Sequence, residues 1–141
     1  MDFYRKYMEL LPTIYPQFRS AITKNGKELI LLIENTQSIK DLSNVEVDDC
    51  SEFEALENHV HLFDKVGKKN KDNVTIVGTA IAKNMLESLK TAFPDKKFVV
   101  YLEVNIKDSV IIRFHQIREK EPLYFEMVQS YKEIEIFEFM N

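Results

Sequence analysis

The chain has 141 residues, and its 23 acidic and 19 basic side chains give it a formal net charge of -4. This length fits one domain with a single core, and a content of 45% hydrophobic and 30% charged residues is typical of a globular protein. The acidic balance argues against broad nucleic-acid binding, because such binding requires basic side chains that neutralise phosphates.

The cysteine count and the apolar runs indicate the compartment. Cys50 is the single cysteine, which excludes an internal disulfide framework and favours a reducing environment. Arg5, Lys6 and Glu9 interrupt the apolar residues of the N-terminus, and no apolar run approaches the length of a membrane span. We therefore expect a cytoplasmic protein that has no signal peptide and does not contact a membrane.

The first predicted element is a short helix that Asp2 can cap. Pro12 and Pro16 are expected to break it, because proline has no N–H to donate to the helix. A hairpin is predicted to follow around Asn25-Gly26, since this dipeptide supplies the positive φ angles of a two-residue type I′ turn. In that register Ile22 opposes Leu29. The second strand is continuously apolar, which is typical of a central strand.

A capping box begins the next predicted helix. In Ser51-Glu52-Phe53-Glu54, the side chains of Ser51 and Glu54 can each satisfy the other's free backbone N–H. Gly67 is placed to end this helix. His59 and His61 would then lie within it, about 200° apart around the helix axis.

Residues 73–93 predict a long amphipathic helix. Its apolar side chains recur at steps of four, and the polar side chains occupy the opposite side. Pro94 stops this helix. The apolar positions are Val77, Ile81, Met85, Leu89 and Phe93.

Two strands are predicted after this helix, at residues 98–104 and 109–115, because both segments are rich in β-branched and aromatic residues. A connecting loop with an odd number of residues opposes Leu102 with Ile112, so that both strands keep their apolar residues on one face. The second face then combines apolar and charged residues, with Glu103 diagonal to Arg113. Its members are Val99, Tyr101, Glu103, Ile111, Arg113 and His115. Residues 133–139 alternate acidic and apolar side chains, which favours a strand over a helix.

Three groups of residues are candidates for chemistry. His59, His61 and Asp64 form an H-x-H-x-x-D string that can chelate a metal on a strand but not on the predicted helix. His115 can join Glu103 and Arg113 in an acid–base group, although an ordinary cross-strand polar cluster is favoured. Asp49 and Glu52 flank Cys50 and favour its thiol over a nucleophilic thiolate. The three glycines are too far apart for a phosphate-binding loop.

The segments L-K-T-A-F-P (89–94), F-V-V-Y (98–101) and R-F-H (113–115) resemble small bacterial proteins of unassigned activity. Some of these are similar to immunity proteins that accompany contact-dependent or polymorphic toxins. The likeness covers residues 58–122. Immunity proteins occlude or clamp one toxin domain, so the resemblance implies a protein partner and no catalysis.

We therefore predict a single α+β domain, in which an antiparallel sheet of about four to six strands carries helices on one face. The predicted function is that of a non-enzymatic protein-binding module, an immunity protein for a basic toxin domain, without a cofactor. The predicted partner-binding residues are Tyr101, Glu103, Arg113, His115, Glu133, Glu135 and Glu138. The alternative is a small metal-assisted enzyme that uses His59, His61, Asp64 and His115.

Overall fold

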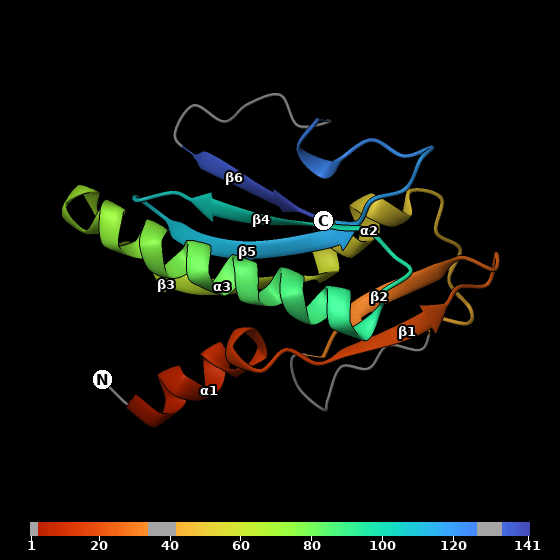
Figure 1. Cartoon of the computed structure of the whole chain (residues 1–141), viewed down its shortest axis with the longest axis horizontal. Helices are drawn as coiled ribbons and strands as arrows, with labels where there is room; N and C mark the ends of the chain where they lie inside the picture. Colours follow the sequence, from red (N-terminus) through yellow and green to blue (C-terminus); the bar gives the residue numbers. More distant parts are fainter. Residues whose placement is uncertain (1–2, 34–41, 127–133) are drawn as a thin grey trace.

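The computed structural model describes residues 3–33, 42–126 and 134–141. Its antiparallel strands form a two-stranded sheet, β1-β2, and a four-stranded sheet of order β3-β5-β4-β6 (Figure 1). The predicted single α+β domain is confirmed, and its strands divide between these two sheets. The elements are α1 (Phe3–Ile14), β1 (Phe18–Ile22), β2 (Glu28–Leu32), α2 (Cys50–Glu57), β3 (His59–Asp64), η1 (Lys68–Asn70), α3 (Lys71–Ala92), β4 (Phe98–Val104), β5 (Ser109–Gln116), η2 (Tyr124–Glu126) and β6 (Glu135–Met140).

The long predicted helix is α3, which runs along one face of the four-stranded sheet (Figure 1). Met85 and Leu89 on the helix and Leu102 on β4 are fully buried in the core that the two elements share. Gly78 permits a close approach, because a Cβ at this position would lie 2.6 Å from Cδ1 of Leu102. The helix ends at Ala92 with Phe93 as its cap residue, one position before Pro94, as the sequence predicts. None of the described helices is long and apolar enough to cross a membrane.

The predicted register of the second hairpin is confirmed. Leu102 of β4 opposes Ile112 of β5, and Val100 opposes Phe114. All seven residues of β4 are buried, which fits its place inside the sheet. The terminal strand is also confirmed, because β6 pairs with β4 and forms one edge of the sheet.

The register predicted for the first hairpin is wrong by one residue. Ile22 opposes Glu28, because the turn contains three residues between Thr23 and Lys27 rather than two. Gly26 has a φ of +76°, but Asn25 is not among the described residues with positive φ, so the turn is not type I′. The amide of Asn25 instead donates 2.9 Å to the carbonyl of Val47 and accepts 3.2 Å from its N–H.

Pro12 lies inside α1, although the sequence predicts that it breaks this helix. The helix continues to Ile14, and the N–H of Tyr15 still donates 2.9 Å to the carbonyl of Leu11. The side-chain amide of Asn84 on α3 donates 3.1 Å to the carbonyl of Thr13. A tertiary contact therefore supports the last turn, where the proline has removed a backbone donor.

Candidate functional site

The predicted second face of the four-stranded sheet lies opposite α3, and it is covered by α2 and η2. Nη1 of Arg113 donates 2.7 Å to the carbonyl of Ala55 on α2. The ring of Phe125 on η2 lies edge-on to that of Tyr101, with 4.7 Å between the ring centroids. These contacts turn most of the face into a second, partly polar interior.

The diagonal pair on this face forms as the sequence predicts. Nε of Arg113 donates 2.8 Å to Oε2 of Glu103, and the two side chains are only 11% and 10% exposed. The guanidinium of Arg113 also lies 5.2 Å from the ring centroid of Tyr124. Arg113 thus contacts both the carbonyl of Ala55 on α2 and the ring of Tyr124 on η2. The pair of Glu103 and Arg113 therefore holds α2 and η2 to the sheet.

His115 is fully buried and uses both ring nitrogens. Its Nε2 accepts from the N–H of Tyr124 at 3.1 Å, so its Nδ1 carries the proton and donates to the carbonyl of Gln116 at 2.7 Å. The hydroxyl of Tyr101 lies 3.1 Å from the same Nε2. Burial lowers the pKa of His115 and raises the pKa of Tyr101. The histidine is therefore a neutral structural group rather than an exposed acid or base.

The predicted partner-binding residues divide into a buried and an exposed set. Tyr101 and His115 are 0% exposed and Glu103 is 8% exposed, so a partner has little of their surface to contact in this conformation. Glu135 and Glu138 are exposed on the edge strand β6. Glu133 lies outside the described residues.

The helix predicted across His59 and His61 is wrong: α2 ends at Glu57, and these residues belong to β3. The helix stops because the side chain of Asn58 bonds the backbone of β2, donating 2.8 Å to the carbonyl of Ile30 and accepting 2.9 Å from the N–H of Leu32. His59 and His61 consequently share a face of the strand, with 5.5 Å between their ring centroids. Among the described residues, no group of three or more His, Cys, Asp and Glu side chains is arranged to hold a metal ion.

The predicted capping box does not form either. Asp49 is the N-cap of α2, and its carboxylate accepts 2.9 Å from the N–H of Glu52. Glu54 points inward instead and is fully buried. Ser51 lies inside the helix, where its N–H donates 2.7 Å to the carboxylate of Glu121.

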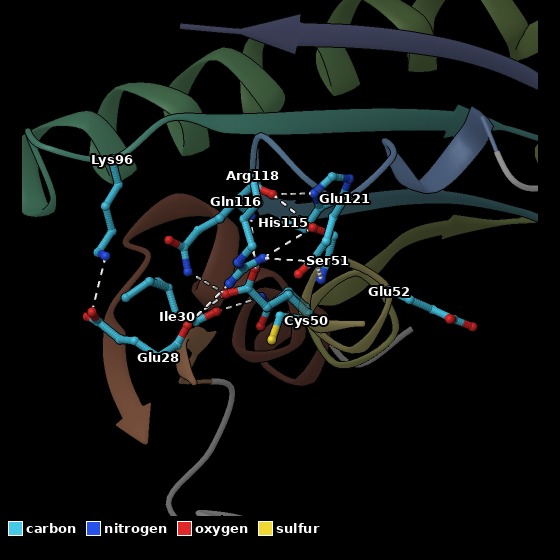
Figure 2. Close-up of polar contacts among 12 residues, drawn as sticks. Glu28, Ile30, Cys50, Ser51, Glu52, Lys96, His115, Gln116, Arg118 and Glu121 are labelled. Atoms are coloured by element: carbon cyan, nitrogen blue, oxygen red, sulfur yellow. Dashed lines mark hydrogen bonds and ion pairs between the residues drawn. The ribbon is translucent and has the colours of Figure 1, made fainter. Parts of the chain in front are cut away.

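Glu54 is the centre of a buried polar group that sequence reasoning missed. Its carboxylate accepts from Nη1 of Arg118 at 2.7 Å and from the N–H of Ile30 at 2.7 Å. The backbone and side-chain N–H groups of Gln116 add bonds of 2.9 and 2.8 Å. Figure 2 shows Gln116, Arg118 and Glu121 gathered over Ser51, whereas Glu52 points away. We call Glu54, Ser51, Gln116, Arg118 and Glu121 the Glu54 cluster.

The Glu54 cluster joins the two sheets. Glu54 satisfies the N–H of Ile30, Asn58 satisfies Leu32, and Arg118 donates 3.2 Å to the carbonyl of Glu28. The edge of β2 is thus closed by side chains rather than by a third strand, which explains how a strand outside the main sheet is buried at residues 29–31. The prediction that β2 is a central strand is accordingly wrong. In the sequence, the only sign of the Glu54 cluster is Glu54 itself, a charged residue on the side of α2 that is buried.

Cys50 lies beside this cluster and is buried. Burial is the main cause that raises the pKa of its thiol, and the charges of Glu121 and Glu54 act in the same direction. This agrees with the predicted preference for the thiol, although Glu121, which acts on it, is distant in sequence.

A family model described as the uncharacterized protein PM0498 family matches residues 16–139. The chain belongs to this family. The match begins after α1, spans α2, α3 and β1 to β5, and covers β6 except for its last residue, Met140. No curated protein and no solved structure matches the chain. The description of this family names no activity.

Proposed function

We propose that the chain is a non-enzymatic protein-binding module, and specifically an immunity protein that neutralises a basic toxin domain by direct binding. The observation that carries this proposal is the exposed edge strand β6, which presents the carboxylates of Glu135 and Glu138 and the half-exposed side chain of Met140 to solvent. Exposed apolar groups bounded by charges are typical of protein-binding surfaces.

The buried reactive groups support a binding role over a catalytic one, because each is committed to the fold. Four donor contacts occupy the carboxylate of Glu54, both nitrogens of His115 are bonded, and Cys50 is 1% exposed. A general base must reach a substrate proton, and these groups face protein atoms instead. The net charge of -4 favours a basic partner.

The test is co-purification of the tagged chain from its native host, repeated with Glu135→Gln/Glu138→Gln. We expect the parent to retain a basic protein, and we expect the variant to associate with it more slowly at low salt, because rim charges mainly set the encounter rate. Glu52→Gln is the control, since Glu52 is exposed on α2 and points away from the Glu54 cluster (Figure 2). A toxin activity that the parent leaves unchanged at saturating concentration contradicts the proposal.

The metal-assisted enzyme remains the alternative proposal, and the shared face of His59 and His61 is the observation that favours it. His115 has no free nitrogen for this role, because both of its ring nitrogens are bonded. Metal analysis of the purified protein tests the alternative. Stoichiometric zinc, manganese or iron that is lost in His61→Ala supports it and ends the binding-only proposal.

A further inference from the structure

The outer edge of β6 has a regular row of backbone groups that point away from the sheet. At the two ends of β4, the carbonyl of Lys97 accepts from the N–H of Ile117 and the N–H of Asn105 donates to the carbonyl of Ser109, so both groups face the side of β5. The N–H of Phe98 faces the opposite side, where it donates to the side chain of Asn141. Backbone direction alternates along a strand, so the even-numbered residues of β4 bond to β6. Their partners in β6 are Glu135, Phe137 and Phe139.

The remaining residues of β6 therefore direct their N–H and C=O groups outward. These residues are Ile136, Glu138 and Met140. No described strand lies beyond β6 in the sheet order β3-β5-β4-β6. An edge of this kind is a template for another extended segment.

A groove lies along the same edge, between β6 and α3. Its volume is about 530 Å³, and it is partly open to solvent. Phe139 and Leu86 supply its apolar floor, and Met140 is 51% exposed at its rim. Alternate side chains of an added strand point toward this groove, so the edge offers both backbone pairing and a place for side chains.

The charges decide which extended segment fits. Lys71 forms an ion pair with Glu135, and Lys90 forms one with Glu87. Lys83 also lines the groove, but no ion pair in the described part of the chain joins a cation to Glu138. A second copy of the chain would bring Glu135 and Glu138 toward the same acidic strand, which like-charge repulsion disfavours. A segment with Lys or Arg next to apolar residues complements the edge instead.

We propose that β6 accepts an extended basic segment of a partner protein as a fifth strand of the four-stranded sheet, with the groove between α3 and β6 holding its apolar side chains. This inference rests on the proposed binding function and names its mode. Main-chain hydrogen bonds to Ile136, Glu138 and Met140 supply the pairing, and Glu138 selects positive charge.

The first experiment measures amide hydrogen exchange of the free protein and of the protein with a probe peptide, acetyl-Lys-Val-Lys-Val-Lys-Val-amide. In the free protein, we expect the amides of Ile136, Glu138 and Met140 to exchange faster than those of Phe137 and Phe139. The peptide is expected to protect the three outward amides. Outward amides that are already protected in the free protein, or that the peptide leaves unprotected at saturation, overturn the proposal.

Matched controls separate strand addition from simple charge attraction. The same peptide with an N-methyl group on every residue keeps its charge but has no backbone donor on either edge, so its binding is expected to disappear. Ile136→Pro removes one outward donor while leaving the bonds to β4, and Ile136→Val is its control. Glu138→Lys should weaken binding about fivefold, in line with one lost surface ion pair. Equal binding of the methylated and unmethylated peptides overturns the proposal.

The outcomes also distinguish this mode from the proposed function. If a toxin domain binds the chain but protects amides on other elements, the binding function stands and strand addition at β6 is wrong. If the probe peptide protects β6 but no protein partner is neutralised, the edge is a genuine acceptor and the immunity role is wrong. Self-association that Glu138→Lys strengthens would assign the edge to a second copy, which overturns the proposal.

Discussion

Glu54 has no exposed surface, yet its charge is balanced by Arg118, whose side chain is 20% exposed. Removing a carboxylate from water is costly, and the attraction between two buried charges offsets this cost only when hydrogen bonds complete the arrangement. Here four donor contacts do so, and no buried side-chain polar atom among the described residues lacks a partner. The main effect of the ion pair on stability is therefore that removing one partner is costly, because the other charge is left buried and unpaired.

We predict that Glu54→Gln lowers the free energy of unfolding by about 3–5 kcal/mol, because it leaves the guanidinium of Arg118 without its counter-charge. Denaturant unfolding measures the loss. The control is Glu52→Gln, which makes the same chemical change two residues earlier at an exposed position of α2 and should be within about 0.5 kcal/mol of the parent. Equal midpoints for both variants would show that the Glu54 cluster does not hold the fold together.

His115 gives the stability a predictable pH dependence. Burial lowers its pKa in the folded protein below the ordinary value of 6.5, so the unfolded chain binds the proton first as the pH falls. The contribution of neutral His115 to the free energy of unfolding is therefore expected to be complete above pH 6.5. It should be lost progressively as the pH falls from 6.5 through the lowered pKa of the folded state.

The measurement is the free energy of unfolding against pH for the parent and for His115→Gln. The variant should be less stable at neutral pH, because Gln cannot reproduce both bonds of the ring, but it should lose the part of the slope that begins near pH 6.5. Identical slopes in the two proteins would mean that His115 does not titrate between these states.

At the scale of elements, the distance between α3 and β4 depends on Gly78. A Cβ there would lie 2.6 Å from the end of the Leu102 side chain, and Leu102 is fully buried. A glycine inside a helix is ordinarily unfavourable, so its presence at this position indicates that close packing outweighs helix propensity.

We expect Gly78→Ala to destabilise the protein by about 1 kcal/mol, as an overpacking cost of about 1–3 kcal/mol less about 1 kcal/mol of improved helix propensity. In a Leu102→Ala background the same change should become neutral or stabilising, because the clash is gone. A double-mutant cycle of denaturant midpoints measures this coupling. Strict additivity would contradict the close contact.

The same scale explains which elements the sequence could predict. The register of β4 and β5 follows from parity alone, because a slip of one residue would put Leu102 and Ile112 on opposite faces of the sheet. β3 was mistaken for helix because its apolar residues Val60 and Phe63 also fit a helical spacing with α2. The feature that ends α2 is the bond between Asn58 and β2, a residue pair 28 positions apart that no local pattern reports.

In the candidate site, too, contacts between residues close in sequence were predictable, and contacts between distant segments were not. The pair of Glu103 and Arg113 was predictable, since both residues lie within one hairpin. The burial of Tyr101 and His115 was not, because it depends on η2 and α2 folding over the second face. The Glu54 cluster was missed because its partners lie 24, 62 and 64 residues from Glu54 in the sequence.

At the scale of the whole molecule, the side chains of Glu54, Asn58 and Arg118 bond the backbone of β2 and so help to join the two sheets. We predict that Asn58→Leu selectively accelerates hydrogen exchange of the amides of Ile30 and Leu32, by about tenfold for each 1.4 kcal/mol lost. Amides of β4 and β5 should change less. Asn84→Ala, which removes a side-chain bond to α1, is the control. Uniform acceleration across both sheets would show that they unfold as one unit.

The distances in sequence within the Glu54 cluster also bear on the order of folding. The first hairpin is local in sequence and can form within microseconds. The group that binds its β2 edge, however, forms only when the loop between Glu54 and Arg118 has closed. On the ribosome, the hairpin and α2 emerge well before Gln116 and Arg118 are synthesised. We therefore expect a nascent chain to expose the β2 edge until Arg118 has emerged, and limited proteolysis of stalled chains should find residues 18–32 protected only after that point.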